Sequence, residues 1–127
     1  MRRFTDEIFA AAPIEELWKL VVDPSRYPEW WSGIASVRPG GAADEFALFH
    51  PEEPELPWPQ RLEAHDGQVL ISCLTSAIRY AWRLTSEDGG TRVAVDVEIP
   101  DDWAEHEASQ RALIGASLPR LVAVATG

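Results

Sequence analysis

The sequence predicts an α+β fold: a seven-stranded antiparallel sheet curved around a long C-terminal helix, with two short helices between strands 1 and 2. Three observations lead to this prediction. Four runs of residues, 58–65, 68–75, 78–85 and 91–99, show strand-like alternation and are separated by short turn signals. Proline signals after the first strand indicate helices there. Finally, an apolar stripe with helical spacing ends the chain.

The first part of the chain predicts one strand, two helices and a hairpin. Residues 3–11 form the strand, and Pro13 then suits the first turn of a helix. A second short helix lies within 25–31. Because Trp30 and Trp31 are neighbours on it, we expect one to pack inward and the other to line a pocket mouth. Further strands are expected at 34–38 and 45–50, followed by a Pro- and Glu-rich loop, 51–57, that would form a mobile rim.

Turn signals set the registers of the last four strands. Asp66-Gly67 favours a tight hairpin, Ser76-Ala77 is treated as a two-residue connection, and a four-residue loop covers 87–90. All three registers place apolar residues on one face, and a one-residue slip would have inverted a strand. They predict these neighbours: Gln60 and Cys73, Cys73 and Tyr80, Ile71 and Trp82, Trp82 and Val95, and Tyr80 and Val97.

The opposite face of these strands is polar and is expected to face solvent. Arg79 with Glu98, and Arg83 with Asp96, are predicted to form ion pairs across neighbouring strands. Two leucines interrupt this face without an explanation. The full set of outward residues is Arg61, Glu63, Leu70, Ser72, Leu74, Arg79, Arg83, Asp96 and Glu98.

The last helix is expected to begin at Asp101 or Asp102 and to run to about Ala125. If Asp102 is the N-cap, Glu105 is placed to complete a capping box. Pro119 lies inside the helix and predicts a bend. An antiparallel sheet with one apolar face needs a cover, and this helix is long enough to provide it. Its apolar stripe comprises Trp103, Gln110, Ile114, Leu118, Leu121 and Ala125.

Length, charge and cysteine content limit the class of protein. The 127 residues suit a single domain, 1–127. A net charge of −10 disfavours nucleic acids and anionic membranes as partners. No signal-like segment and no membrane-spanning apolar stretch are present, and the single cysteine excludes an internal disulfide. We therefore expect a cytoplasmic protein without membrane insertion, whose oligomeric state the sequence leaves open.

Five segments of the chain share a recognisable pattern: Ala12–Trp18, Asp23–Trp31, Trp82–Leu84, Gly90–Val93 and Ser117–Leu121. Together they resemble the START-like (SRPBCC, polyketide cyclase/dehydrase) superfamily. The resemblance implies a helix-grip fold with a cavity between the sheet and the C-terminal helix. Its members include lipid carriers, binders of hormones and aromatic ligands, polyketide aromatase/cyclases and chaperone cofactors, so it implies the fold more sharply than the function.

The predicted ligand site lies where polar residues interrupt the apolar face of the sheet. Gln60 and Tyr80 are placed to hydrogen-bond a carbonyl or hydroxyl group, and Trp58 and Trp82 to stack on a ring. The alternative is that these side chains satisfy one another in an ordinary core. The predicted ligand-binding residues are Trp58, Gln60, Cys73, Tyr80, Trp82, Val97, Gln110, Ile114 and Leu118.

Evidence for chemistry in the sequence is sparse. The three histidines have no metal-ligand spacing, and we expect neither a metal nor a cofactor. His106 lies one helical turn before Gln110 and, with Tyr80, is a candidate for proton transfer. His65, beside a hairpin turn, is expected on the surface. Cys73 is interpreted as an inert, buried thiol with a raised pKa.

Three functions are consistent with these patterns. The leading hypothesis is binding of a small hydrophobic ligand (aromatic, polyketide or acyl/lipid) in the predicted cavity. The first alternative is a polyketide aromatase/cyclase-like enzyme, in which proximity and orientation supply most of the catalysis. The second alternative is a protein-interaction module of the chaperone-cofactor type. It would have a filled core and an exposed patch around Trp30 or Trp31.

Overall fold

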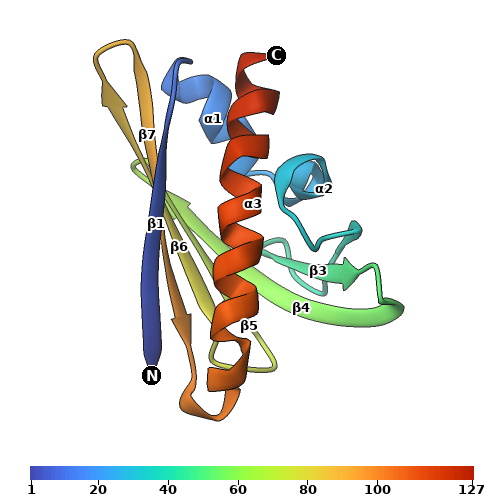
Figure 1. Ribbon diagram of the computed structural model, residues 1–127. Helices are drawn as coiled ribbons and strands as arrows, with labels where there is room; N and C mark the ends of the chain where they lie inside the picture. The colour runs from blue at the N-terminus through green and yellow to red at the C-terminus, as the bar shows by residue number, and fades with distance from the viewer.

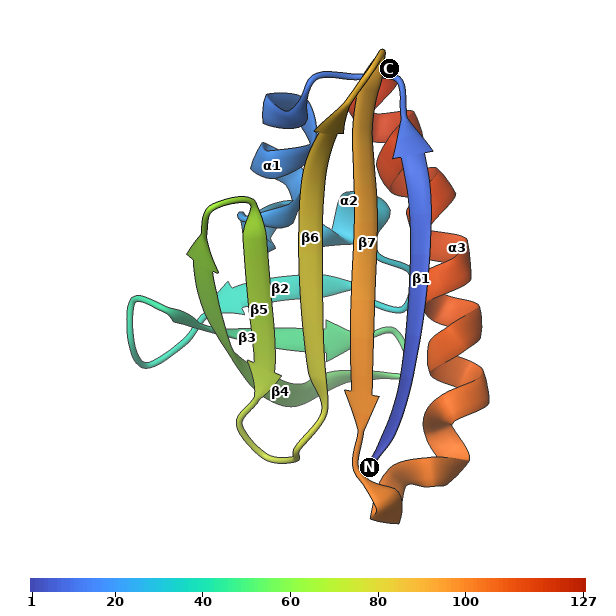
Figure 2. The same cartoon turned by 90° about the vertical axis from the view of Figure 1, so that its left-hand side faces the viewer.

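The computed structural model describes residues 1–127 and has the predicted α+β architecture. One antiparallel sheet carries seven strands in the order β1-β7-β6-β5-β4-β3-β2 (Figures 1 and 2). All its helices lie on one face of this sheet, and the long C-terminal helix runs along that face beside β1 (Figure 2). The strands are β1 (Arg2–Ala10), β2 (Ser36–Pro39), β3 (Glu45–His50), β4 (Glu53–His65), β5 (Gln68–Cys73), β6 (Arg79–Glu87) and β7 (Gly90–Ile99).

The helices fall into two groups. Three short ones connect β1 to β2, and two follow β7. None of them combines the length and the apolar character that a membrane-spanning helix needs. The elements are α1 (Ile14–Val21), the 3-10 helix η1 (Pro24–Arg26), α2 (Tyr27–Trp30), the 3-10 helix η2 (Asp101–His106) and α3 (Glu107–Thr126).

Two of the three predicted hairpin registers are confirmed, and the middle one is wrong by two residues. Gln60 pairs with Cys73 across β4–β5, and Tyr80 pairs with Val97 across β6–β7. Between β5 and β6, however, Tyr80 pairs with Ile71, because the connection spans residues 74–78 rather than two residues. A shift of two preserves which face each side chain points to. The predicted faces therefore survive, but Tyr80 is no longer directly beside Cys73.

The segment predicted as a loop, 51–57, is mostly strand. Only a short turn separates β3 from β4, and β4 begins at Glu53. Pairing of β4 with β5 begins at Gln60, so the prolines at 54, 57 and 59 lie beyond the part of β4 that β5 pairs with. A strand tolerates proline where one side carries no ladder of hydrogen bonds. This end of β4 pairs with β3 alone, so the β3–β4 hairpin extends beyond β5 (Figure 1).

The start of the final helix also differs from the prediction. Pro100 is the N-cap residue and no side chain caps the helix, so neither Asp102 nor the proposed capping box is used. The chain first winds as the 3-10 helix η2, interrupted at Trp103, whose φ and ψ of −114° and 17° are not helical. From there α3 continues without interruption through Pro119. The bend at Pro119 stays a prediction.

Both tryptophans of the α2 segment are buried, against the expectation that only one would be. Trp30 is fully buried and Trp31 is 4% exposed. Helix α2 ends at Trp30, and the extended backbone of Trp31, with φ −85° and ψ 106°, turns its ring inward as well. The two rings stack at 5.4 Å, and both meet Trp82 edge-on. Two neighbouring side chains can therefore both point inward when the helix ends between them.

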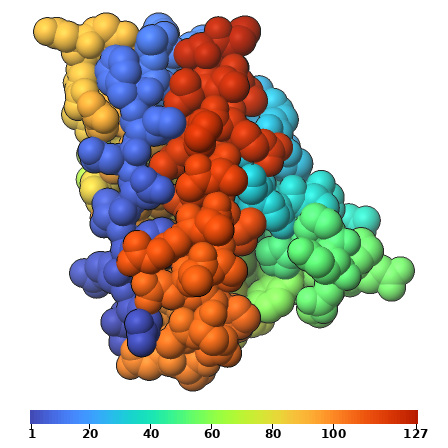
Figure 3. Space-filling model, in the orientation of Figure 1, coloured from blue at the N-terminus to red at the C-terminus, as the bar shows by residue number.

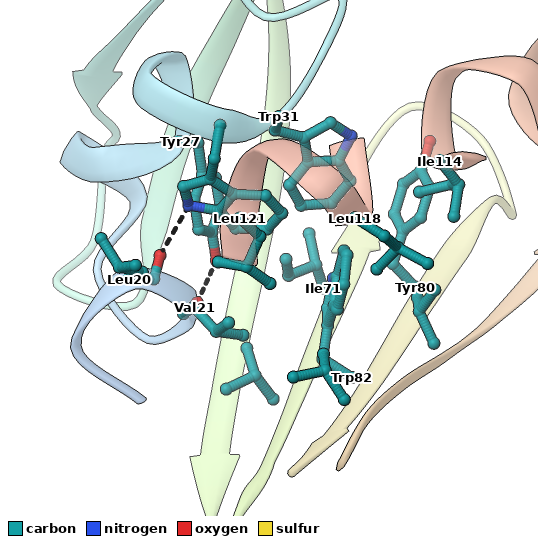
Figure 4. Packing of buried hydrophobic residues seen from close by; sticks show 14 of the residues in the cluster. Leu20, Val21, Tyr27, Trp31, Ile71, Tyr80, Trp82, Ile114, Leu118 and Leu121 are labelled. Carbon is teal, nitrogen blue, oxygen red and sulfur yellow. Dashed lines mark hydrogen bonds between the residues drawn. The ribbon is translucent and has the colours of Figure 1, made fainter. Parts of the chain in front are cut away.

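The side chains of Trp30 and Tyr27 also donate hydrogen bonds to backbone carbonyls at the end of α1. The indole Nε1–H of Trp30 donates to the Leu20 carbonyl at 3.1 Å. The hydroxyl of Tyr27 donates to the Val21 carbonyl at 2.6 Å (Figure 4). Carbonyls in the last turn of a helix lack helical partners. The residue that would bond Leu20 is Pro24, which has no N–H group. The α2 segment is thus fastened to α1 as well as to the sheet.

The outer face of the sheet is charged, as predicted. Arg83 contacts Asp96, and Arg79 lies 4.0 Å from Glu98. Thr5 of β1 adds a hydrogen bond of 2.5 Å to Asp96. Together these contacts tie β1, β6 and β7 on the side of the sheet that the helices leave open.

Candidate functional site

The space between α3 and the sheet is filled in one half and open in the other. The aromatic cluster of α2, with Trp82 and Leu118, fills the half nearest the end of α3 (Figure 4). A pocket of about 550 Å³ lies at the other end, where η2 and the start of α3 face the β3–β4 hairpin. In Figure 3 the green tip of this hairpin stands clear of the orange helix. The pocket is lined by Leu48, His50, Glu52, Glu53, Trp58, Gln60, Cys73, Ile78, Tyr80, Trp103, His106 and Gln110.

A chain of aromatic rings crosses the pocket from the sheet to the helix. His50 of β3 meets Trp58 of β4 edge-on at 5.6 Å, and Trp58 meets Trp103 of η2 edge-on at 5.9 Å. Trp103 in turn lies 5.1 Å from His106. Edge-to-face contacts at these separations are favourable. These rings therefore offer apolar surface against which a planar ligand could stack.

His50 is held in one orientation by the backbone. Its Nδ1 lies 2.8 Å from the carbonyl oxygen of Gly33. A carbonyl only accepts hydrogen bonds, so Nδ1 carries a proton in this arrangement. In the neutral ring, Nε2 is then the unprotonated nitrogen, which can accept a hydrogen bond or a proton.

Tyr80 bridges the sheet and the helix inside the pocket. Its hydroxyl donates to Oε1 of Gln110 on α3 at 2.8 Å. Burial raises the pKa of Tyr80 far above its usual range, and the neighbouring Cys73 adds to this effect. The phenol is consequently neutral at physiological pH and acts as a hydrogen-bond donor, not as a base.

Two buried polar atoms of the lining residues have no hydrogen-bond partner. They are Nε1 of Trp58, a donor, and Oε1 of Gln60, an acceptor. The amide nitrogen of Gln60 reaches the carbonyl of Trp58 at 3.4 Å, and Gln60 as a whole is only 3% exposed. Buried polar groups without partners are costly and rare in proteins. An unmatched donor and an unmatched acceptor next to one pocket are the arrangement expected where a ligand supplies the partners.

Cys73 differs from its sequence interpretation. Burial raises the pKa of its thiol, but hydrogen bonds from the side chains and backbone of Ser76 and Thr75 outweigh burial, so the pKa is lowered. The Sγ atom lies 3.4 Å from the Thr75 hydroxyl oxygen. The prediction of a raised pKa was wrong because it treated the surroundings as apolar. The connection 74–78, which is longer than predicted, brings polar groups to the sulfur.

The charged residues of the pocket are acidic. Glu52 and Glu53 lie at its rim, exposed at the tip of the β3–β4 hairpin. No lysine or arginine lines it. Since the whole chain carries a net charge of −10, the potential around the opening disfavours anions.

The predicted site residues divide into two groups. Trp58, Gln60, Cys73, Tyr80, Gln110 and the proton-transfer candidate His106 all line the pocket. The other four predicted ligand residues do not line it. They are packed in the core at 0–2% exposure, and Trp30 and Trp31 lie directly against one of them, Trp82. These four are Trp82, Val97, Ile114 and Leu118.

Sequence reasoning missed several lining residues. Leu48 and His50 belong to the inward side of β3, and their spacing of two from buried Phe46 was a readable signal. Trp103 was placed on the helix stripe but not in the site. Glu52 and Glu53 were not predicted to line the site because the segment 51–57 was expected to be a loop. His65 is exposed, as predicted.

Comparison with known proteins identifies the family. The family model described as "Polyketide cyclase / dehydrase and lipid transport" matches residues 1–126. The chain belongs to the polyketide cyclase/dehydrase and lipid transport family. The comparison with curated proteins gives no match. The resemblance read from the sequence is confirmed, and so is the helix-grip arrangement of this family member.

Solved structures share this fold at low sequence identity. Protein MLL2253 from Mesorhizobium loti superposes with a TM-score of 0.80 at 14% identity, covering 97% of this chain and 96% of that one. XoxI from Bacillus cereus gives 0.76 at 17% identity, with coverage of 95% and 93%. StfQ, a di-domain ARO/CYC from the steffimycin biosynthetic pathway, gives 0.76 at 12% identity, covering 98% of this chain and 50% of that chain. At these identities the likeness concerns the fold alone.

Proposed function

We propose that this protein binds a small, uncharged, ring-containing hydrophobic molecule in the pocket between the β3–β4 hairpin and the start of α3. The observation that carries the proposal is the unpartnered pair formed by the Trp58 indole N–H and the Gln60 amide oxygen. A ligand with a carbonyl and a hydroxyl group would supply both missing partners once these two side chains turn toward the pocket. Ligand pockets are typically apolar surfaces with a few such orienting groups.

The size and charge of the pocket narrow the ligand class. A volume of about 550 Å³ is within the range of small-molecule sites. The aromatic rings of Trp58 and Trp103 favour a planar ligand. The rim carboxylates of Glu52 and Glu53 disfavour a ligand that carries its own carboxylate. Uncharged phenols and ketones therefore suit the site better than free fatty acids.

A matched pair of probes tests this proposal. β-Naphthol and β-naphthoate share a ring system but differ in charge at neutral pH. Isothermal titration calorimetry should show tighter binding of the naphthol. Replacing Gln60→Leu should weaken naphthol binding about tenfold, the equivalent of one hydrogen bond. Native mass spectrometry of the protein purified from its own host would then search for the natural ligand.

An equivalent substitution elsewhere on the sheet is the control. Gln68→Leu makes the same chemical change on β5, where Gln68 is exposed and outside the pocket. It should leave the affinity unchanged. Equal affinities of the wild type and Gln60→Leu, or tighter binding of the naphthoate, would contradict the proposal.

A second candidate function is a cyclase-like reaction in the same pocket. The observation that favours it is His50, whose Nε2 is left as the basic nitrogen, in a pocket that also holds the neutral Tyr80 hydroxyl. A base can remove a proton from a carbon between two carbonyls, and the Tyr80 hydroxyl can stabilise the enolate oxygen once its hydrogen is no longer donated to Gln110. His106, exposed at the rim, is a further group able to carry protons.

Turnover of a poly-β-keto substrate distinguishes this reaction from binding alone. His50→Gln should reduce turnover by about 100-fold if His50 is the base. His65→Gln, on the exposed hairpin, is the matched control and should be neutral. If the wild type forms no cyclised or dehydrated product, the cyclase-like reaction is wrong and only the binding role is supported.

The chaperone-cofactor alternative receives less support. It called for an exposed patch around Trp30 or Trp31, and both of these side chains are buried. It also called for a filled core, whereas the half of the helix–sheet space at the start of α3 contains the pocket. Neither the exposed tryptophan patch nor the completely filled core that this alternative predicts is present.

A further inference from the structure

Cys73 is the one cysteine of the chain, and it lies in the wall of the ligand pocket. It is the last residue of β5 and pairs directly with Gln60 on β4. The residue is 7% exposed. Ligand binding as proposed above assigns no role to its thiol, although a ligand in the pocket would lie against it.

The groups around the sulfur favour its ionised form. The 74–78 connection folds back over Cys73, and the Thr75 hydroxyl oxygen lies 3.4 Å from Sγ. The hydroxyl and backbone N–H groups of Thr75 and Ser76 together lower the pKa of the thiol despite its burial. A thiolate is the nucleophilic form of cysteine. The two carboxylates of the pocket, Glu52 and Glu53, lie at its exposed rim on the β3–β4 hairpin.

A second and independent feature points to a ligand at this place. Gln60, directly opposite Cys73, is 97% buried, since only 3% is exposed, and its Oε1 has no partner. The indole N–H of Trp58, two residues away on the same face of β4, is also unpartnered. Diagonal neighbours on a sheet lie about 7–8 Å apart, within reach of aromatic and long side chains. One small molecule can therefore contact the sulfur and both polar groups.

Building on the proposed binding function, we propose that the pocket takes a hydroxylated α,β-unsaturated ketone and that Cys73 adds covalently to its β-carbon. The Trp58 N–H donates to the ketone oxygen, and the Gln60 oxygen accepts from the ligand hydroxyl. The conjugated, planar shape of such a ketone suits the aromatic rings that line the pocket.

The addition needs no oxidant, reductant or second substrate. The sulfur lone pair forms a C–S bond to the β-carbon, and the π electrons of the C=C bond move to give an enolate. The Trp58 N–H stabilises the developing charge on the enolate oxygen. The α-carbon then takes up one proton, which replaces the one that the thiol lost to solvent. The product is a thioether ketone with the mass of protein and ligand combined.

The test uses p-hydroxybenzylideneacetone as the electrophile and its saturated analogue as the matched control. The two share the ring, the hydroxyl and the ketone, but only the first has a C=C bond. Intact-protein mass spectrometry should show a single adduct on the wild type and none on Cys73→Ser. The second-order rate should exceed that of N-acetylcysteine by about tenfold or more. The saturated analogue should slow the reaction by competition.

Further variants separate recognition from reactivity. Gln60→Leu should slow the reaction with the unsaturated ketone about tenfold. It should slow the reaction with iodoacetamide, which is too small to use these contacts, much less. Thr75→Val should slow both reagents. A wild-type rate no faster than that of N-acetylcysteine, or equal rates for the wild type and Gln60→Leu, would overturn the covalent role.

The two proposals fail in different ways. If calorimetry detects the saturated analogue binding to both the wild type and Cys73→Ser but no adduct forms, ligand binding stands and the covalent step is wrong. If the saturated analogue binds neither protein and the adduct forms only at the rate of a free thiol, both proposals are wrong.

Discussion

The indole nitrogen of Trp30 stabilises the fold, whereas that of Trp82 destabilises it. Replacing each tryptophan by phenylalanine should reveal this difference in the free energy of unfolding. Both side chains are fully buried and lie 5.2 Å apart in the same cluster. The Trp30 N–H donates to the Leu20 carbonyl, whereas the Trp82 N–H has no partner. Trp30→Phe and Trp82→Phe remove the same atoms, so the loss of apolar contact is comparable and largely cancels in the comparison.

The hydrogen-bonding term does not cancel. Trp30→Phe leaves the Leu20 carbonyl buried without its donor, because the residue four positions on is Pro24, and an unpaired buried group costs about 1–3 kcal/mol. Trp82→Phe removes an unpaired donor and so relieves a penalty of similar size. We therefore expect Trp30→Phe to be the more destabilising by about 2 kcal/mol or more.

Urea unfolding followed by far-ultraviolet circular dichroism measures this difference, because the peptide backbone dominates that signal and the midpoint does not depend on its amplitude. With an m-value of about 2 kcal/mol per M, the midpoint of Trp30→Phe should lie about 1 M below that of Trp82→Phe. Equal m-values for the two variants are the control for an unchanged unfolding transition. If the midpoints coincide, or Trp82→Phe unfolds first, the assignment of these two indole nitrogens is wrong.

Two further predictions concern polar contacts away from the pocket. Thr91→Val should lower the free energy of unfolding by about 1–3 kcal/mol, because the buried Thr91 hydroxyl donates to the Ala12 carbonyl at 2.8 Å; a thermal or urea melt that matches the wild type contradicts this. The hydrogen bond from Thr5, and then Arg83, lower the pKa of Asp96. The ionised carboxylate therefore stabilises the fold above about pH 4, the ordinary carboxyl range. This stabilisation is lost as the pH falls through the lowered pKa. Asp96→Asn should accordingly be less stable than the wild type at neutral pH, and the gap should close in acid; a gap that is constant with pH argues against the assignment.

Local patterns in the sequence determined the elements and their faces. Period-two alternation identified the inward side of β4 to β7, and the Asp66-Gly67 turn placed Gln60 opposite Cys73 correctly. The apolar spacing of the final helix likewise identified the residues that pack on the sheet. These features depend on neighbours along the chain or across one turn, which a sequence displays directly.

Only the tertiary structure decided how much of the space under α3 stays open. Trp30 and Trp31 come from a short segment whose path is set by contacts with α1, the sheet and α3, and their rings close the half of the cavity where Trp82 lies. The open pocket therefore lies at the start of α3. The properties of Cys73 changed for a similar reason, because a five-residue connection, not a two-residue one, brings hydroxyl and amide groups to its sulfur. Volume filling and pKa values depend on atoms that meet in space from distant parts of the chain, and no local pattern encodes them.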